Sequence, residues 1–382
     1  MDNAKRKIVI VGPVYPYKGG IAHYTSLLYK ALNKKYDVKL ISFKFQYPTF
    51  LYPGQEQKDY ANDQFKVENT CFLINTIHPG SWIRTVYQIK KYGPDVIILQ
   101  WWNPFFAPSY FVISLLSRIL TKTKIIFTCH NVLPHDRMPF DKQMTRLTLG
   151  VGHHFIVQSG DDENKLLALL PKANYKRAFH PTYNVFKIED LPKVRAREML
   201  GIGARERVLL FFGFIREYKG LQYLIRAMPQ VFQFYEDIKL LIVGDFYDNK
   251  QKYVEDVRSL GLTNNVKIYD GYIPDKEVGK FFAASDIVVL PYISATQSGI
   301  VQIAYGFERP VIVTNVGGLP DVVADNRTGY VVEPHNSAQL ADAIIKYFAK
   351  NKERTLTKNI KNDQEKYSWD RMVEVVEALL NW

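Results

Sequence analysis

The feature that most constrains this 382-residue chain is the alternation of short apolar runs with amphipathic segments. Runs without polar alternation are typical of strands that are buried on both faces, as in parallel sheets. Five such runs in the first half are KIVIVG (7–12), VKLISF (38–43), DVIILQ (95–100), KIIFTC (124–129) and HFIVQS (154–159). Amphipathic stretches between them, such as residues 22–35, predict helices.

The pattern restarts after a proline-containing stretch at residues 180–186. The runs of the second half are RVLLFFG (207–213), KLLIVGD (239–245), NVKIYDG (265–271), DIVVLPY (286–292), RPVIVTN (309–315) and TGYVVEP (328–334). Strands that alternate with helices in both halves predict an α/β protein with two doubly wound, parallel-sheet domains. The length favours the same division, because single cores rarely grow beyond about 250–300 residues.

Composition narrows the class of protein further. Apolar residues make up 47% and charged residues 23% of the chain, as in soluble globular proteins, so we expect no extended disorder. The two cysteines, Cys71 and Cys129, provide neither a disulfide framework nor zinc-ligand spacing, which favours a cytoplasmic protein. The N-terminal apolar run stops at Gly12-Pro13 and predicts a strand, not a signal peptide, and no apolar run reaches the roughly 20 residues of a membrane span.

The charge is divided unevenly along the chain. Residues 1–185 contain 24 lysines and arginines against 12 acidic residues, whereas the remainder contains 26 of each, so the whole net charge of +12 belongs to the first half. This asymmetry indicates either an anionic partner of the first half or a basic surface that serves only solubility.

Ligands of open parallel sheets bind beyond the carboxyl ends of the strands, so we expect the chemistry of this chain in the loops that follow strands. After the first strand, Gly19 and Gly20 precede a helix, where backbone N–H groups and the helix end can meet an anion. A tight turn explains the same glycines. The loop is not GxGxxG, and no acidic residue closes the second strand, which disfavours a dinucleotide-dependent dehydrogenase.

The strand KIIFTC ends in His130 and Asn131, at an edge where a side chain can point into a cleft. An imidazole there can bond a sugar hydroxyl or exchange a proton with an acceptor, and the alternative is a purely structural histidine.

In the second half, Arg216 and Lys219 lie in the loop between a buried strand and a helix. Two cations on such a loop can neutralise a leaving diphosphate, and the alternative is a solvated surface pair. The next two strands end in VGD (243–245) and DGYIP (270–274), where backbone groups and an aromatic ring can meet a nucleotide base.

The stretch SGIVQIA (298–304) follows a strand and begins a helix. We expect the N–H groups of Gly299, Ile300 and Val301 to converge at the positive end of that helix, which predicts a phosphate site.

Taken in chain order, the motifs GG, TCHN, FFGFIREYKG, VGD, SGIVQ, GFERPVIVT and NVGGLPDVV resemble those of family-4 retaining glycosyltransferases with the GT-B fold, over nearly the whole chain. The resemblance implies two Rossmann-like domains facing across a cleft: residues 1–183 for the acceptor, residues 184–365 for the donor, and residues 366–382 as a helix that crosses back onto the first domain. It implies transfer of a sugar from a nucleoside diphosphate donor, with retention of configuration and with no metal and no cofactor.

By position, the resemblance implies that Arg216 and Lys219 clamp the diphosphate, that Gly299 and Ile300 cap it, and that His130 faces the transferred sugar. Gly20 would touch the diphosphate from the first domain. The other implied donor-binding residues are Gly19, Gly213, Gly244, Asp245, Tyr272, Ile273, Gln297, Ser298, Val301 and Gln302.

The sequence departs from the family at two points. The arginine of the clamp is displaced, since Phe214 follows Gly213 and Arg216 comes two residues later. The second departure concerns two glutamates. The family usually presents two glutamates with seven residues between them, the first at the sugar and the second at the ribose. Placement by Pro310 puts Ala295 and Ile303 at those positions, and placement by Ser298-Gly299-Ile300 puts Thr296 at the first. The nearest polar side chains are Gln297 and Gln302, which bond hydroxyls but carry no charge.

For the acceptor, the resemblance implies a glycan, a lipid-linked molecule or another hydroxyl compound, as in polysaccharide biosynthesis. Aromatic residues concentrate over residues 101–111 ahead of a basic segment, which predicts either a core cluster or contact with a membrane or a lipid-linked acceptor. The second reading places a cytoplasmic, peripheral protein at the inner face of the membrane.

Other functions stay open at this point. The missing carboxylates allow a non-catalytic binder of nucleotide sugars, and a nucleotide-sugar epimerase shares the two-domain plan. A nucleic-acid partner is disfavoured, because no basic helix or RNA-recognition signature accompanies the charge.

Overall fold

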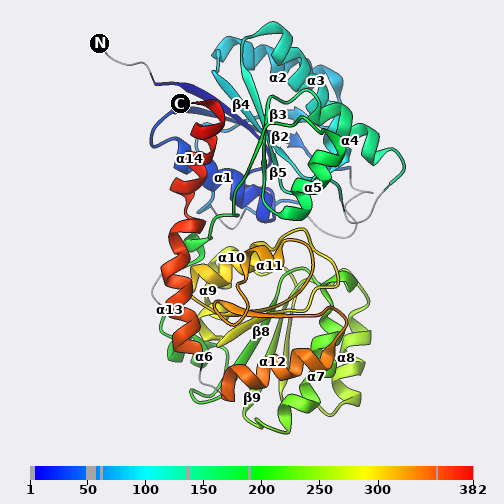
Figure 1. The fold of residues 1–382 in the computed structure, drawn as a ribbon, viewed down its shortest axis with the longest axis vertical. Coiled ribbons are helices and arrows are strands. Elements are labelled where there is room, and N and C mark those ends of the chain that lie inside the picture. Colours follow the sequence, from blue (N-terminus) through cyan, green and yellow to red (C-terminus); the bar gives the residue numbers. More distant parts are fainter. Residues whose placement is uncertain are drawn as a thin grey trace. The chain divides into compact units, whose positions relative to one another are not determined.

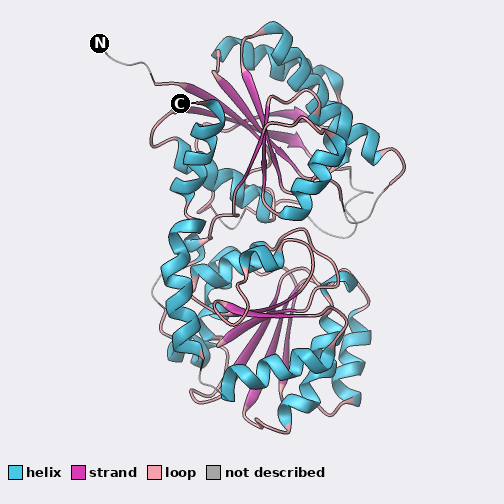
Figure 2. Ribbon diagram, viewed as in Figure 1, coloured by secondary structure: helices cyan, strands magenta, loops and turns pink. Residues whose placement is uncertain are grey.

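The protein is described by a computed structural model over residues 5–48, 57–60, 63–134, 138–187, 191–349 and 352–381. The chain forms two compact units, one of Met1–Phe179 with Trp369–Trp382 and one of His180–Ser368. The divisions thus lie after residues 179 and 368, a few residues from the predicted positions after 183 and 365. In each unit a layer of strands is covered by helices on both faces (Figure 2).

The first unit contains a seven-stranded parallel sheet in the order β3-β2-β1-β4-β5-β6-β7. Its strands are β1 (Lys7–Val11), β2 (Asp37–Phe45), β3 (Cys71–Asn75), β4 (Val96–Trp101), β5 (Lys124–Cys129), β6 (His154–Val157) and β7 (Tyr175–Arg177). Its helices are α1 (Gly20–Leu32), α2 (Pro79–Tyr92), α3 (Ala107–Leu120), α4 (Asp141–Leu149), α5 (Gly160–Leu169) and α14 (Trp369–Leu380). The order reverses between β1 and β4, as expected of a doubly wound sheet.

The core of the first unit lies on both faces of this sheet. Successive residues of β1 alternate between two apolar clusters: Val9 packs in one and Ile10 in the other, and both are fully buried. The second cluster includes Met372 and Val376 of α14, so the last helix of the chain completes the core of the first unit. Hydrogen bonds from Tyr36 Oη and Lys35 Nζ to Glu377 Oε1, at 2.6 and 3.1 Å, hold the same helix at its surface.

The second unit contains a six-stranded parallel sheet in the order β10-β9-β8-β11-β12-β13. Its strands are β8 (Arg207–Phe212), β9 (Ile238–Gly244), β10 (Val266–Asp270), β11 (Ile287–Leu290), β12 (Val311–Thr314) and β13 (Gly329–Val332). Its helices are α6 (Lys193–Met199), α7 (Leu221–Phe232), α8 (Lys250–Ser259), α9 (Asp275–Ala284), α10 (Gly299–Gly306), α11 (Leu319–Val322), α12 (Ser337–Ala349) and α13 (Glu353–Asp363) (Figure 1). The order reverses between β8 and β11.

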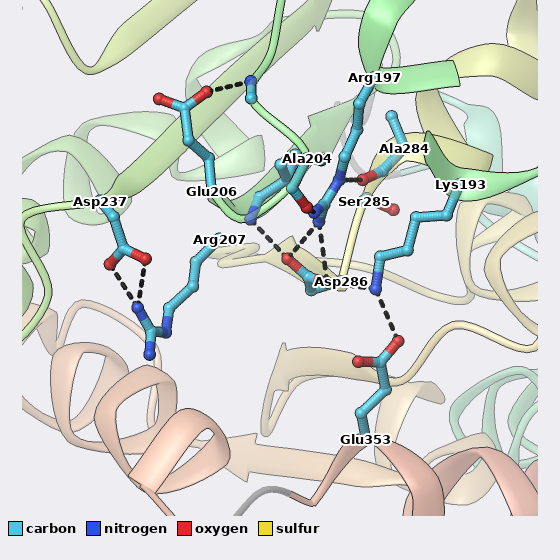
Figure 3. Close-up of polar contacts among 12 residues, drawn as sticks. Lys193, Arg197, Ala204, Glu206, Arg207, Asp237, Ala284, Ser285, Asp286 and Glu353 are labelled. Atoms are coloured by element: carbon cyan, nitrogen blue, oxygen red, sulfur yellow. Dashed lines mark hydrogen bonds and ion pairs between the residues drawn. The ribbon is translucent and has the colours of Figure 1, made fainter. Parts of the chain in front are cut away.

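A buried charge network ties the amino edge of the second sheet together (Figure 3). Asp286, which precedes β11, accepts hydrogen bonds from Arg197 Nη2 at 2.9 Å and from the Val208 N–H at 2.6 Å, and it also pairs with Lys193. Lys193 in turn contacts Glu353 at 2.8 Å. One carboxylate therefore joins α6, β8 and β11, and through Lys193 the network extends to α13.

The aromatic cluster at residues 101–111 is part of the core. Trp101, Phe106 and Tyr110 are at most 1% exposed and pack in the cluster that includes Val9. Of the two readings left open by the sequence, core packing therefore holds for these three side chains. Among the described residues, no helix is both long and apolar enough to cross a membrane.

Candidate functional site

The loops that follow β8, β9 and β11 meet at the carboxyl edge of the second sheet, where its strand order reverses. Such a reversal is where ligands bind in doubly wound sheets. The segment after β9 runs beside the loop after β8, with hydrogen bonds from the Ile215 N–H to the Asp245 carbonyl at 2.8 Å and from the Tyr247 N–H to the Ile215 carbonyl at 3.0 Å. The two loops therefore act as one unit.

Gly244 is required for this close pairing of the two loops. Its φ is +145°, and a Cβ on it would lie 1.9 Å from the carbonyl oxygen of Gly213. A Cβ on Gly213 would itself lie 3.6 Å from the side chain of Ile300. The loop after β8 is thus held between the end of β9 and the start of α10.

Arg216 projects from this loop and is exposed. Its guanidinium lies 4.8 Å from the centre of the Tyr247 ring, so a ring that follows β9 orients a cation that follows β8. Two carboxylates, Asp248 and Glu217, are close by. The pKa of Asp248 is raised overall, because burial and the charge of Glu217 outweigh the opposing effect of the Arg216 charge. The cation is thus partly balanced by local acids.

Lys219 is half-buried, and its Nζ lies 3.7 Å from the centre of the Tyr292 ring. Burial lowers the pKa of Lys219, and the positive charge of Arg216 lowers it further. The Tyr292 ring is fully buried, and its hydroxyl hydrogen-bonds the Ser298 hydroxyl at 3.3 Å. Tyr292 therefore links the lysine to the residue that precedes α10.

The turn between Tyr292 and Ser298 is fixed on both sides. The Ile293 N–H donates to the Tyr218 carbonyl at 2.7 Å, and the Gly318 N–H donates to the Thr296 carbonyl at 2.8 Å. Gly220 allows the first contact, because a Cβ on it would lie 1.9 Å from the Pro291 carbonyl oxygen. The turn is consequently a rigid support for the start of α10.

The start of α10 offers two backbone N–H groups, against the three that the sequence predicts. Ser298 precedes the helix but makes no side-chain cap, and no described residue accepts a hydrogen bond from the N–H of Gly299 or Ile300. The Val301 N–H donates to the Ser298 carbonyl at 3.2 Å, and its side chain is buried. Two N–H groups at the positive end of a helix suit an anion.

The remaining predicted donor residues of this unit differ in exposure. Gln297, Tyr272 and Ile273 are half-buried, whereas Gln302 is 1% exposed within α10. Asp245 is 6% exposed, and within the described part of the chain its Oδ2 has no hydrogen-bond partner. A buried carboxylate oxygen without a hydrogen-bond donor is costly in free energy. Asp245 is therefore a candidate to accept a hydrogen bond from a hydroxyl or amide group of a ligand.

The positions where the family would carry glutamates are closed to solvent. Ala295, Thr296 and Ile303 are 7%, 3% and 6% exposed. These three side chains are therefore buried, and none of them is a carboxylate.

In the first unit, His130 lies at the carboxyl end of β5 and is 4% exposed. Its Nε2 lies 2.8 Å from Gln100 Oε1. The centres of its ring and of the Tyr24 ring are 4.7 Å apart, and the two rings are nearly perpendicular. The imidazole is thus enclosed by protein groups in this structure.

Asp162 is a buried residue near this loop that sequence reasoning missed. It accepts a hydrogen bond from the Val132 N–H at 2.8 Å, while its own N–H donates to Ser159 Oγ at 3.1 Å. Burial raises the pKa of Asp162 to about 6. The Ser-x-x-Asp spacing before α5 is a capping signal that would have located the helix start, although not the bond to Val132.

Gly19 and Gly20 border a pocket of about 170 Å³ at the carboxyl edge of the first sheet. Gln46, Tyr47 and Trp102 line the same pocket, and the Trp102 Nε1–H donates to Tyr47 Oη at 3.1 Å. Aromatic rings beside amide and hydroxyl groups suit a sugar-like molecule, which has both apolar and hydroxyl-bearing faces.

A larger pocket of about 630 Å³ in the second unit lies elsewhere, between Phe307, Arg309 and α13. It lies away from the carboxyl ends of the strands, and neither Arg216 nor Lys219 lines it. We therefore place the candidate site at the β8 and β11 loops. No group of three or more metal-binding side chains that could hold an ion occurs among the described residues.

Comparison with known proteins addresses the second unit directly. Residues 206–350 match the family model of glycosyl transferases group 1. This segment runs from β8 to α12 and contains Arg216, Lys219 and the start of α10. The match therefore covers most of the second unit and includes the loops of the candidate site.

Curated relatives match over part of their length. An uncharacterized glycosyltransferase of Methanocaldococcus jannaschii is 30% identical over 185 residues, which cover 48% of this chain and 46% of the relative. A D-inositol 3-phosphate glycosyltransferase of Corynebacterium diphtheriae is 29% identical over 155 residues, 39% of this chain and 36% of the relative. The chain thus matches less than half the length of these relatives.

Solved structures match the whole chain at lower identity. Sucrose-phosphate synthase from Thermosynechococcus elongatus has a TM-score of 0.73 at 20% identity and covers 98% of this chain and 100% of its own. Anabaena HepE in complex with UDP has a TM-score of 0.75 at 18% identity, with coverage of 98% and 100%. The fold is therefore the GT-B fold, with two Rossmann-like, doubly wound parallel-sheet domains.

Proposed function

We propose that this protein transfers a sugar from a nucleoside diphosphate donor to a hydroxyl acceptor, as a family-4-like retaining glycosyltransferase. The observation that carries the proposal is the grouping of Arg216, Lys219 and the start of α10 on loops of the segment that matches group 1 glycosyl transferases. HepE, which shares the fold, has been solved with UDP and with UDP-glucose, which supports a nucleotide-sugar donor.

The proposed chemistry follows from the charge that develops on the leaving group. When the bond between sugar and diphosphate breaks, negative charge grows on the diphosphate oxygens. Arg216 and Lys219 neutralise that charge, and the N–H groups of Gly299 and Ile300 donate hydrogen bonds to it. These groups are held in place before reaction, since Tyr247 and Tyr292 orient the cations and the turn before α10 is fixed.

The remaining donor contacts are proposed by place in the fold. The residues at or just after the carboxyl ends of β8, β9 and β10 would surround the nucleoside. They are Gly213, Gly244, Asp245, Tyr272 and Ile273. Four residues at the start of α10 would border the sugar and diphosphate: Gln297, Ser298, Val301 and Gln302. Because Val301 and Gln302 are buried, they would hold the helix start in place and not contact the donor directly.

On the acceptor side, we assign the pocket of Gln46, Tyr47 and Trp102 to a glycan or lipid-linked hydroxyl compound, with Gly19 and Gly20 at its border. His130 is proposed to face the transferred sugar, which requires its bond to Gln100 to exchange for a substrate hydroxyl.

Retention is proposed to proceed without an enzymic nucleophile. Ala295, Thr296 and Ile303 provide no carboxylate, so the acceptor hydroxyl would attack on the face that the diphosphate leaves. The proton of that hydroxyl would pass to a departing diphosphate oxygen, and neither a metal nor a cofactor takes part in this scheme.

The experiment that tests activity supplies UDP- and GDP-sugars with candidate glycan or lipid-linked acceptors and follows the product by NMR. A glycosylated product with the donor's anomeric configuration supports the proposal. Donor binding with neither transfer nor hydrolysis would favour the alternative, a nucleotide-sugar-binding protein. The observation that favours this alternative is the absence of the two glutamates. Release of free epimerised sugar would favour an epimerase.

A cytoplasmic location, with peripheral attachment to the inner face of the membrane, is part of the same proposal. It rests on the basic first half of the chain and on a lipid-linked acceptor.

A further inference from the structure

Three neighbouring helices of the first unit present an unusual concentration of exposed apolar side chains. Helix α3 packs against both α2 and α4, and the three form one side of the unit (Figure 1). Seven of the fourteen exposed large apolar side chains of the described residues lie on these helices or beside them. They are Ile83 (52% exposed), Tyr87 (63%), Ile119 (65%), Leu120 (48%), Met138 (72%), Phe140 (70%) and Leu147 (59%).

The exposed residues of α2 follow the helical repeat. Ile83 and Tyr87 are four residues apart, so they lie on the same face, while Trp82, Val86 and Ile89 are buried against the sheet. The apolar exposure of α2 is therefore a second stripe, separate from the one that forms the core. A solvent-exposed apolar stripe of this kind is expected to be covered by another surface.

Cations surround these apolar side chains, and acids are nearly absent. The segments 79–92, 107–122 and 138–149 contain one acidic residue, Asp141, whose Oδ2 accepts a hydrogen bond from the Met138 N–H. The same segments contain the exposed cations Arg84, Lys90, Lys91, Arg118, Lys122, Lys142 and Arg146. No described residue forms a salt bridge with any of these seven.

We infer that the α2–α3–α4 face of the first unit docks onto an anionic lipid bilayer. Aliphatic side chains enter the boundary between headgroups and acyl chains, and a tyrosine is suited to the headgroup level. The surrounding lysines and arginines are attracted to anionic lipid headgroups. A second copy of the chain fits less well, because cations without nearby acids repel an identical surface.

This surface differs from the aromatic cluster at residues 101–111, whose three largest buried members belong to the core. The basic composition of the first half indicates an anionic partner. We place the contact with that partner on the outer faces of α2, α3 and α4, and not at residues 101–111. Vesicle binding is measured without a sugar donor, so its result does not depend on whether the protein transfers sugar.

The test is sedimentation of the full chain with vesicles of phosphatidylcholine alone, or of equal parts phosphatidylcholine and phosphatidylglycerol, at low salt. We expect binding to the anionic vesicles alone, and weaker binding as salt is raised, because exposed charges are screened. Arg84→Gln with Lys142→Gln should weaken binding about 25-fold, or about fivefold for each cation removed. Tyr87→Ser with Ile119→Ser should also weaken it, and the effect should persist at higher salt.

Matched controls lie in the second unit. Arg354→Gln with Lys358→Gln removes two exposed cations, and Phe234→Ser removes an apolar side chain that is 62% exposed. These variants should bind like the unaltered chain, and circular dichroism should show that all variants are folded.

Three results would overturn the inference. The first is no binding to anionic vesicles, and the second is equal loss of binding in the control variants. The third is a dimer in solution that Tyr87→Ser with Ile119→Ser dissociates while vesicles leave the protein unbound, which would assign the face to a second copy of the chain.

Discussion

At the scale of single residues, the candidate site depends on two cations that aromatic rings hold in place. Both cations were predicted from the sequence, because a loop between a buried strand and a helix faces the carboxyl edge of a sheet. The rings of Tyr247 and Tyr292 were not predicted as their partners. These rings follow β9 and β11, and only the strand order brings three separate loops together.

Lys219 gives a prediction about pH. Its pKa is lowered from the ordinary value of 10.5 by burial, so it loses its charge at a lower pH than an exposed lysine. Diphosphate binding should therefore weaken at a lower alkaline pH than it would with an exposed lysine, because the neutral amine cannot pair with the anion. Lys219→Arg should shift that weakening to higher pH, since arginine stays charged.

Titration of UDP by calorimetry across alkaline pH measures this effect. The Arg354→Gln variant, altered far from the β8 loop in sequence, is the control and should follow the unaltered protein. If the pH profile of Lys219→Arg coincides with that of the unaltered chain, Lys219 does not contact the diphosphate.

At the scale of elements, two buried carboxylates fix the ends of helices and strands, and neither was identified from the sequence. The long-range partners of a buried acid leave no local sequence signal, because they come from distant parts of the chain. Asp286, for example, accepts from Arg197 and from the Val208 N–H, 89 and 78 residues away.

Asp286→Ala should destabilise the second unit by about 3–5 kcal/mol, because it leaves the buried guanidinium of Arg197 without its counter-charge. Asp237→Ala is the matched control: it breaks the pair with Arg207, which is partly exposed, and should cost about 1 kcal/mol or less (Figure 3). Urea unfolding of both variants measures the difference. Equal losses would mean that the Asp286 network contributes no more than a surface pair.

Asp162 predicts a pH-dependent stability of the first unit. Its pKa is about 6 in the folded protein against 3.8 ordinarily, so the folded state holds the proton more tightly than the unfolded chain. The free energy of unfolding should then fall as the pH rises from about 4 through 6. A shift of this size corresponds to about 3 kcal/mol at most.

Asp162→Asn keeps an acceptor for the Val132 N–H but cannot ionise. Relative to the unaltered protein it should gain stability between pH 4 and pH 7, as measured by urea unfolding at both values. A constant difference at the two pH values would show that Asp162 does not carry the shift.

At the scale of the whole molecule, the two parallel sheets were predicted and every predicted strand is present. Fully buried runs such as residues 96–101 give a strong signal, because they are apolar on both faces. The strands β3 and β7 were missed, since both are edge strands and have at most one buried residue. The return of α14 to the first unit was suggested only by family resemblance, because an amphipathic helix does not specify which sheet it covers.

The roles of the candidate site residues stay predictions, and the structure adds local hydrogen bonds that the sequence does not show. The sequence placed His130 at a strand end, yet it did not show that Gln100 encloses it. It placed Val301 at a helix start, yet the N–H of Val301 is bonded within the first turn. Such hydrogen bonds depend on side-chain and turn geometry, which residue spacing leaves open.

The central claim is that Arg216, Lys219 and the start of α10 hold the diphosphate of a nucleotide, and calorimetric titration of UDP and GDP tests it most directly. We expect that one of the two nucleotides binds, that Arg216→Ala and Lys219→Ala each weaken binding by about 1–3 kcal/mol, and that Arg354→Ala has no effect. Unchanged nucleotide affinity in both of the first two variants would contradict it.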